Sequence, residues 1–163
     1  MRLMLTLTAL TALSLAACEP QSTVEAGAPD AGAATTTPSE TAPPMELGGV
    51  DLAGNISVLG TEPFWAVGFE GAEMVYSGLD RPEQRAPRPA PEVLGTTATS
   101  QTTTAEGNDL TVSLMATECS DGMSDRTYPL TAQVEIAGEE LIGCAAATEW
   151  LHSTDETGAP REG

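Results

Sequence analysis

The side chains with the widest chemical range in this sequence are its three cysteines and its single histidine. Neither Cys119 nor Cys144 belongs to a Cys-x-x-Cys pair or has a neighbouring base, so nothing here favours a redox-active dithiol. Zinc would need more ligands than the lone His152, and a Ser-His-Asp hydrolase would need that same residue as its base. Lysine is absent, which removes Schiff-base chemistry. We therefore expect no enzyme and no cofactor.

An acidic segment is the main candidate for cation binding. Asp121 and Asp125 lie close to Ser120 and Ser124, and all four side chains carry oxygen atoms that Ca²⁺ could use. The spacing does not match the EF-hand loop, which needs acidic or amide positions at one, three and five and a Glu at twelve. Calcium stays an alternative, and no metal site is predicted.

The segment from Thr61 to Trp65 places two aromatic rings next to each other. Neighbouring residues of a strand point to opposite faces, so Phe64 and Trp65 cannot both enter a single core. One ring packs inside, and the other either lies under the segment Arg81–Glu92 or lines a binding pocket. The candidate ligand contacts are Glu62, Phe64, Trp65, Asp121, Asp125 and Tyr128.

Strands must position these side chains, because apolar and polar residues alternate through the second half of the chain and no segment has a sustained helical period. The predicted strands are Ile56–Leu59, Phe64–Glu70, Glu73–Leu79, Val93–Thr104 (an exposed edge), Asp109–Thr117, Tyr128–Ile136 (with Tyr128 facing inward) and Glu140–Ala147. The segment Arg81–Glu92 carries four prolines and three arginines, which is typical of an extended crossover. The expected fold is all-β: a small antiparallel meander of six to eight strands that forms a barrel or sandwich.

The first eighteen residues indicate export. Arg2 precedes an uncharged run that is too short for a membrane span, which needs roughly 20 residues, so the run reads as a cleaved signal peptide. The run ends in Leu15-Ala16-Ala17-Cys18, which resembles the lipobox of bacterial lipoproteins. The resemblance implies that Cys18 carries lipid at the start of the mature chain. Glu19 follows it in place of the Asp associated with inner-membrane retention, which favours the outer membrane.

Lipidation of Cys18 would leave Cys119 and Cys144 as the remaining thiols of an exported protein. An even pair in an oxidising compartment predicts a disulfide. The bond would close a loop of roughly 25 residues, worth about 3–4 kcal/mol in the chain-entropy model.

The charge and the spacing of apolar residues divide the chain into four parts. Residues 1–17 are the signal peptide, 18–46 an Ala-, Thr- and Pro-rich disordered tether, 47–152 the β-domain and 153–163 a polar tail. The full chain has a net charge of −18, and its mature form keeps five arginines against 24 acidic residues. Such a chain should not bind nucleic acid and should attract basic partners.

Three motifs together resemble a family of uncharacterised bacterial envelope lipoproteins. They are Thr61-Glu62-Pro63-Phe64-Trp65, then the segment from Cys119 to Asp125 running into Tyr128-Pro129, and Leu141-Ile142-Gly143-Cys144-Ala145. The resemblance implies fold and location rather than an activity. A looser likeness is to the acidic β-barrel lipoproteins that inhibit c-type lysozyme. The chain departs from their Ser-Gly-x-x-Tyr motif, because Leu79-Asp80-Arg81 follows Ser77-Gly78.

The function predicted from these observations is a membrane-anchored envelope lipoprotein whose β-domain binds a basic envelope protein or a small molecule without catalysis. Two alternatives stay open. One is an inhibitor of a basic exported hydrolase such as c-type lysozyme, and the other is a structural envelope-maintenance protein without a discrete ligand.

Overall fold

The computed structural model describes residues 45–161, and strands make up most of them. The predicted signal peptide, the lipidation residue Cys18 and the tether up to residue 44 lie outside the described residues. The elements are β1 (Glu46–Leu47), β2 (Val50–Asp51), β3 (Ile56–Thr61), β4 (Phe64–Glu70), β5 (Glu73–Gly78), β6 (Arg81–Pro87), β7 (Glu92–Leu94), β8 (Thr97–Thr103), β9 (Asp109–Met115), β10 (Cys119–Ser120), β11 (Thr127–Tyr128), β12 (Leu130–Ile136), β13 (Glu139–Ala147) and α1 (Thr148–Ser153).

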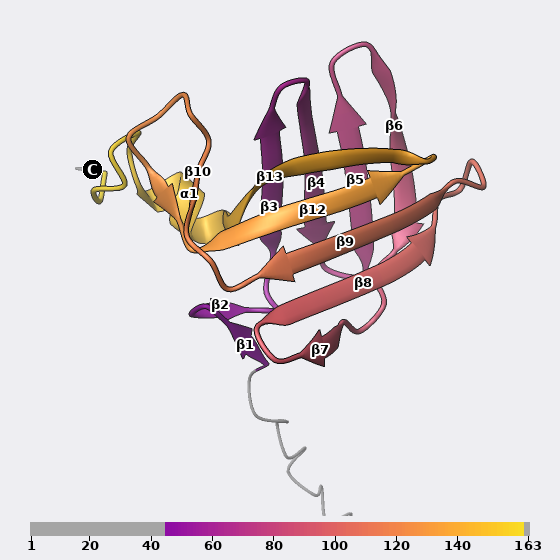
Figure 1. Ribbon diagram of the computed structural model, residues 1–163, viewed down its shortest axis with the longest axis horizontal. Helices are drawn as coiled ribbons and strands as arrows, with labels where there is room; N and C mark the ends of the chain where they lie inside the picture. The colour runs from indigo at the N-terminus through magenta and orange to yellow at the C-terminus, as the bar shows by residue number, and fades with distance from the viewer. Residues whose placement is uncertain (1–44, 162–163) are drawn as a thin grey trace, which may run out of the picture. The chain divides into compact units, whose positions relative to one another are not determined.

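Nine of these strands form one antiparallel sheet, in the order β6-β5-β4-β3-β13-β12-β9-β8-β7. Strands β3 to β6 form one meander, and β13 joins it to the later strands by pairing with β3. In Figure 1 the strands β8, β9, β12 and β13 run crosswise to β3–β6, so the sheet curls over on itself as a half-barrel. The all-β antiparallel class is confirmed, with nine strands in the sheet where six to eight were predicted. The remaining strands form two hairpins, β1–β2 and β10–β11.

The core fills the space between the crossed parts of this sheet. The period-2 alternation of each strand sends one set of side chains inward, as the sequence predicts. In β9 the buried residues are Leu110, Val112 and Leu114. Strand β12 supplies Leu130, Ala132, Val134 and Ile136, and strands β3 and β4 supply Ile56, Val58, Trp65, Val67 and Phe69. The hairpin β1–β2 adds Leu47 and Val50 to the same cluster.

Polar contacts join the edge strand β6 to the β8–β9 loop at the other side of the curled sheet. The Oε1 atom of Gln84 in β6 accepts hydrogen bonds from Thr104 Oγ1 at 3.1 Å and Asn108 Nδ2 at 2.8 Å. The backbone N–H of Ala105 donates to the carbonyl oxygen of Arg85 at 2.8 Å. These bonds connect the edge strand β6 to the β8–β9 loop, so they satisfy part of an edge that would otherwise be open.

The segments Arg81–Glu92 and Val93–Thr104 differ from their predicted structure. Arg81–Glu92 was predicted to be a crossover loop, but Arg81–Pro87 pairs with β5 as the edge strand β6. Its prolines are tolerated because an edge strand needs only one row of hydrogen bonds. Val93–Thr104 was predicted to be a single edge strand, but Gly95, with φ +61°, turns the chain there and makes the hairpin β7–β8.

A second, smaller cluster lies on the outer side of β13. Tyr128, Cys144 and Ala146 are buried there, with Leu59, Trp150 and Leu151 packed against them. The prediction that Tyr128 faces the main core is wrong, because Pro129 separates β11 from β12 and Tyr128 belongs to the β10–β11 hairpin. The hairpin and α1 therefore cover this part of the outer face.

Candidate functional site

An open groove lies where the β3–β4 turn, the β5–β6 turn and the β10–β11 loop meet. Four apolar side chains line it although they face solvent, with exposed fractions of 52% for Phe64, 66% for Leu79, 68% for Met123 and 59% for Ile142. They are four of the seven large apolar side chains that are exposed in residues 45–161. The groove has a volume of about 860 Å³, and its other lining residues are Thr61, Glu62, Pro63, Asp121 and Gly122. Exposed apolar groups gathered in one concave place are typical of a contact surface.

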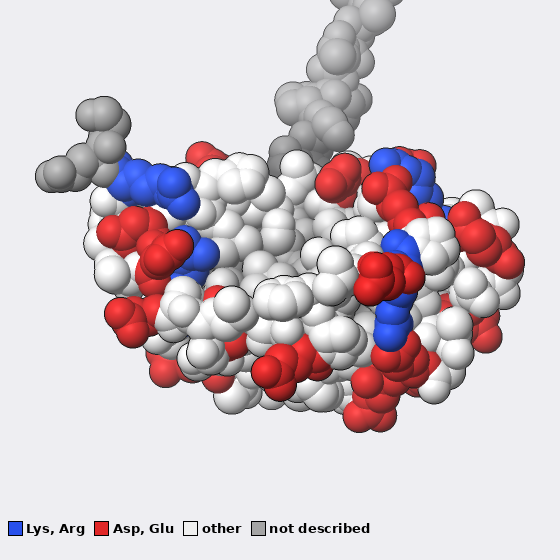
Figure 2. Space-filling model, turned by 90° about the horizontal axis from the view of Figure 1, so that it is seen from above, with Lys and Arg blue, Asp and Glu red and all other residues white. Residues whose placement is uncertain are grey.

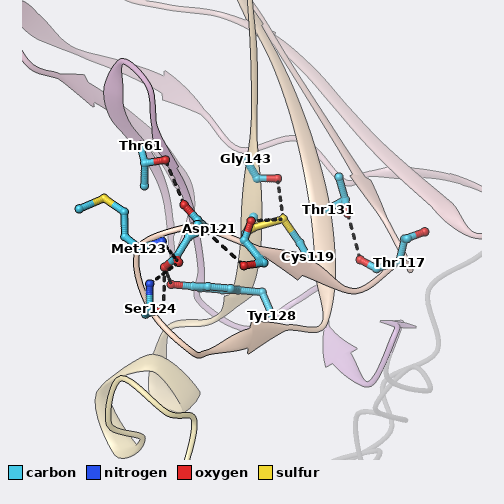
Figure 3. The surroundings of a disulfide bond; sticks show 12 residues. Thr61, Thr117, Cys119, Asp121, Met123, Ser124, Tyr128, Thr131 and Gly143 are labelled. Carbon is cyan, nitrogen blue, oxygen red and sulfur yellow. Dashed lines mark hydrogen bonds between the residues drawn. A yellow bond between two sulfur atoms is a disulfide. The ribbon is translucent and has the colours of Figure 1, made fainter.

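Asp121 organises the loop that forms one wall of the groove (Figure 3). Its Oδ1 atom accepts hydrogen bonds from the backbone N–H groups of Met123 at 2.9 Å and Ser124 at 2.8 Å. Its Oδ2 atom accepts from Ser124 Oγ at 2.9 Å and from the Tyr128 hydroxyl at 2.8 Å. Both carboxylate oxygens are thus occupied by the loop itself, and the loop holds Met123 at the groove.

The hydrogen bonds to Asp121 also determine its charge. Burial alone would raise the pKa of this carboxyl group, because desolvation disfavours the charged form. The donors from Ser124, Met123 and Tyr128 outweigh burial and lower the pKa to about 2. Burial and the bond to Asp121 raise the pKa of Tyr128, so this hydroxyl stays a donor. Asp121 therefore remains an anion at any physiological pH.

The disulfide between Cys119 and Cys144 fixes the base of this loop to the outer face of β13. The two Cα atoms lie 5.5 Å apart, and the predicted pairing is confirmed. Thr61 Oγ1 donates a hydrogen bond to the backbone oxygen of Asp121 at 3.1 Å, which connects the loop to the end of β3. One covalent and one polar contact therefore place Met123 beside Phe64 and Ile142.

Trp65 lies on the opposite side of the sheet from the groove. It is 4% exposed and belongs to the main core. Its partners on the two neighbouring strands are Gly60 of β3 and Gly78 of β5. A Cβ atom on Gly60 would lie 2.2 Å from the Trp65 Nε1 atom, and one on Gly143 would lie 2.9 Å from its Cζ2 atom. The indole thus occupies space that these glycines leave free.

The structure brings together three of the six candidate ligand contacts. Glu62, Phe64 and Asp121 line the groove. Tyr128 is buried beside Trp150, with ring centroids 6.0 Å apart, and supports the loop through Asp121. Asp125 is exposed in the same loop but does not line the groove, and Trp65 packs in the core.

Three of the four exposed apolar side chains that line the groove were missing from the sequence prediction. Leu79, Met123 and Ile142 are isolated apolar residues at a turn, in a loop and on the solvent-facing side of a strand. The outward position of Ile142 can be read from the alternation with Leu141, whereas nothing local indicates that the three side chains meet. Their approach depends on the pairing of β13 with β3 and on the disulfide.

The charged groups around the groove are mostly acidic. Figure 2 shows this side of the molecule, with uncharged surface between acidic groups and with arginines confined to two places beside acidic groups. Each arginine of the described residues donates hydrogen bonds within the protein: Arg81 to Glu139 and Tyr76, Arg85 to Glu73 and Glu83, Arg88 to the carbonyls of Leu52 and Gly54, Arg126 to that of Asp155 and Arg161 to that of Thr154. The arginines are therefore used internally.

Arg126 also orders the end of the described chain. Its guanidinium lies 5.9 Å from the Trp150 ring centroid and 6.0 Å from that of Tyr128. It donates to the backbone oxygen of Asp155 at 2.6 Å, and the Asp155 carboxylate accepts hydrogen bonds from Thr157 and Ala159. This contact joins the loop after α1 to the second cluster.

Within residues 45–161, no three His, Cys, Asp or Glu side chains gather in a way that could hold a metal ion. Over the same residues, no helix is long and apolar enough to cross a membrane. The chain matches no protein-family model, no curated protein and no solved structure. The function is therefore inferred from the geometry of the groove.

Proposed function

We propose that this protein is a lipid-anchored lipoprotein of the bacterial cell envelope, held in the outer membrane and facing the periplasm, whose β-domain binds a partner or ligand through the groove without catalysing a reaction. The observation that carries the binding role is the gathering of Phe64, Leu79, Met123 and Ile142 at the surface. Each of them would bury apolar area on contact, at roughly 25 cal/mol per Å² before the costs of association.

The lipobox-like Leu15-Ala16-Ala17-Cys18 supports the location. Lipid on Cys18 would keep the domain near the membrane surface without a spanning segment, since several acyl chains each contribute about 0.8 kcal/mol per buried methylene. The residues between Cys18 and the domain, rich in Pro and Thr, would give the groove reach from that surface.

Photo-crosslinking in cells tests the binding role. A photoreactive amino acid at Leu79 of the full-length chain should capture a partner reproducibly, and the same amino acid at Leu94, which is 80% exposed in β7, is the matched control. Ile142→Ser should abolish the capture from Leu79, and the purified partner should bind the protein with the same dependence on Ile142. No groove-dependent capture would contradict a binding function and favour a passive structural role.

The acidic composition favours one second candidate, an inhibitor of a basic exported hydrolase such as c-type lysozyme. Attraction to such an enzyme should be greatest at low ionic strength. Inhibition that appears at low salt and is lost in Leu79→Ser would support it. Unchanged lysozyme activity at low salt would rule out that enzyme as the target.

A further inference from the structure

Four outward side chains form a continuous row across the strand ends at the groove. Thr61 of β3 pairs with Phe64 of β4, and the N–H of Leu79 donates to the carbonyl oxygen of Phe64 at 2.9 Å. The ladder of β13 with β3 ends at Cys144 and Leu59, and Ile142, two residues beyond it, lines the groove together with Thr61 and Phe64. Neighbouring strands lie about 4.8 Å apart, so a row that reaches from Ile142 across β3 and β4 to Leu79 is about 14 Å long. An extended polypeptide covers that length with about four residues.

A wall stands beside this row. The loop 121–126 is joined to the end of β3 by Thr61 and to β13 by the disulfide (Figure 3), and its Met123 lines the groove together with the row. Methionine adapts its shape to different apolar groups, which suits a surface that receives side chains of a partner. The groove is open rather than closed around a cavity, so it suits a segment lying across it better than an enclosed small molecule.

The charged residues at the groove indicate which kind of polypeptide segment can bind there. Its lining contains Glu62 and Asp121 and no arginine. Among the described residues Glu62 has no ion-pair or hydrogen-bond partner, whereas Asp121 is occupied by its own loop. Glu140 lies on the same outward face as Ile142, two residues earlier, and pairs directly with Glu135 of β12. Two carboxylates facing each other across a strand pair repel, and a cation between them would relieve that repulsion.

We infer that the groove takes an extended polypeptide segment of a partner that carries apolar side chains flanked by Lys or Arg. The apolar side chains would contact Phe64, Leu79 and Ile142, and the basic ones would face Glu62 and Glu140. This inference rests on the proposed binding function and adds the chemistry of the partner. Other occupants fit the charge less well. A second copy of the chain, with a net charge of −18, is repelled, and so is an anionic lipid surface. The chain's own first 44 residues also fit the charge less well, because Arg2 is their single basic residue.

Three synthetic peptides of about eight residues, longer than the row at about 3.3 Å per residue, test the inference. One has Leu at its four central positions and Lys at both ends, the second has Glu in place of each Lys, and the third has Ser in place of each Leu. Binding is measured by titration into the protein purified from cells that express the full-length chain. The Lys–Leu peptide should bind at least about tenfold more tightly than either of the others. Its affinity should fall as salt rises to about 0.15 M, where the screening length is about 8 Å.

Variants localise the binding. Leu79→Ser should weaken the binding of the Lys–Leu peptide by about tenfold or more, which is the loss expected when one buried Leu contact is removed. Glu62→Gln should weaken it by about two- to fivefold, the size of a solvent-exposed ion pair. The matched controls are Leu94→Ser and Glu92→Gln in β7, which remove the same groups away from the groove and should change nothing.

Two results would overturn the inference. One is equal binding of the Glu–Leu peptide, and the other is binding of the Lys–Leu peptide that is unaffected by Leu79→Ser. If either occurs while crosslinking from Leu79 still captures a partner in cells, the groove binds something of other chemistry and the proposed function stands. If crosslinking from Leu79 also fails, both the inference and the proposed function are wrong.

Discussion

Asp121 is the residue on which the shape of the groove wall depends. Its carboxylate accepts four hydrogen bonds from within seven residues of chain, two from backbone N–H groups and two from hydroxyls. A short polar side chain that receives backbone donors in this way replaces regular secondary structure in a loop. The loop can therefore present an apolar residue, Met123, to solvent without a strand to hold it.

Replacing Asp121 by Asn should destabilise the protein in a pH-dependent manner. The folded-state pKa of Asp121 is lowered to about 2, so its charge stabilises the folded state above the ordinary carboxyl pKa near 4 and stops doing so as the pH falls through about 2. At pH 6 we expect the free energy of unfolding of the variant to be about 1 kcal/mol lower than that of the wild type, and its melting temperature to be lower accordingly. The difference should shrink between pH 4 and pH 2 in thermal unfolding followed by circular dichroism.

Asp125→Asn is the control for this pH series, because Asp125 lies in the same loop and is exposed. It should leave the melting temperature almost unchanged at every pH. A difference between wild type and Asp121→Asn that stays constant down to pH 2 would show that the carboxylate charge is not what stabilises the loop.

Gly143 has no room for a side chain. A Cβ atom there would lie 2.2 Å from the backbone oxygen of Leu59, which cannot move without breaking the pairing of β13 with β3. We expect Gly143→Ala to lower the free energy of unfolding by about 1–3 kcal/mol, measured by denaturant titration. In the control, Gly68→Ala, the closest atom is the mobile end of Glu70 at 3.0 Å, so that variant should be neutral or slightly stabilised. Equal stability of the two variants would refute this account of the strand junction.

At the scale of elements, the β10–β11 hairpin is attached to the sheet mainly through its disulfide and its hydrogen bonds. The hairpin has only two paired positions, Cys119 with Tyr128 and Ser120 with Thr127. So short a ladder is not stable alone, and the hairpin depends on the outer face of β13 for support. The nine-stranded sheet, in contrast, has its own core and continuous pairing.

Removal of the disulfide should affect the two parts differently. The double variant Cys119→Ala/Cys144→Ala is expected to lose about 3–4 kcal/mol of stability, because the bond closes a loop of 25 residues. Relative to the wild type, hydrogen exchange of residues 119–128 should become faster in the variant. Exchange of β9 and β12, whose pairing is unchanged, should change less. Reduced wild-type protein keeps both cysteine side chains. Comparing it with the double variant therefore separates the effect of losing the covalent bond from the effect of losing the packing of the side chains. Unaltered exchange in the hairpin would mean that its hydrogen bonds suffice.

At the scale of the whole molecule, the proposed anchor and the acidic domain have opposite relations to a membrane. Lipid at Cys18 would hold the chain to the bilayer, whereas the acidic chain, with a net charge of −18 over its full length, would be repelled by anionic head groups. The groove would then be presented to soluble or peripheral partners rather than to lipid. Basic partners would be attracted over a distance set by the salt concentration.

Cys18→Ala should release the protein from membranes. We expect the wild type to incorporate labelled palmitate and to sediment with the membrane fraction, and the variant to do neither. Because Cys18 precedes the domain, the release should leave the melting temperature of the domain unchanged. A Cys18→Ala variant that still sediments with membranes and carries palmitate would contradict the lipoprotein assignment.

The fold class and the disulfide could be predicted from the sequence, because strand alternation and the number of available thiols are both visible without the tertiary structure. Alternation of apolar and polar residues marks strands such as Phe64–Glu70, whose predicted bounds are those of β4. The pairing of Cys119 with Cys144 was predicted because they are the two thiols that remain once Cys18 is assigned to the lipid anchor. Edge strand β6 was missed because its prolines are typical of loops, and only its position beside β5 shows that its unpaired side tolerates them.

The tertiary structure alone decided the candidate site. Phe64, Glu62 and Asp121 could be named from their types, but Leu79, Met123 and Ile142 look like ordinary isolated apolar residues in the sequence. They meet because β13, late in the chain, returns to pair with β3, and because the disulfide brings the loop 121–126 to the same end of the sheet. The curl of the sheet decides that Trp65, rather than its neighbour Phe64, packs in the core. Contacts between residues far apart in sequence depend on strand order, which alternation within one strand does not encode.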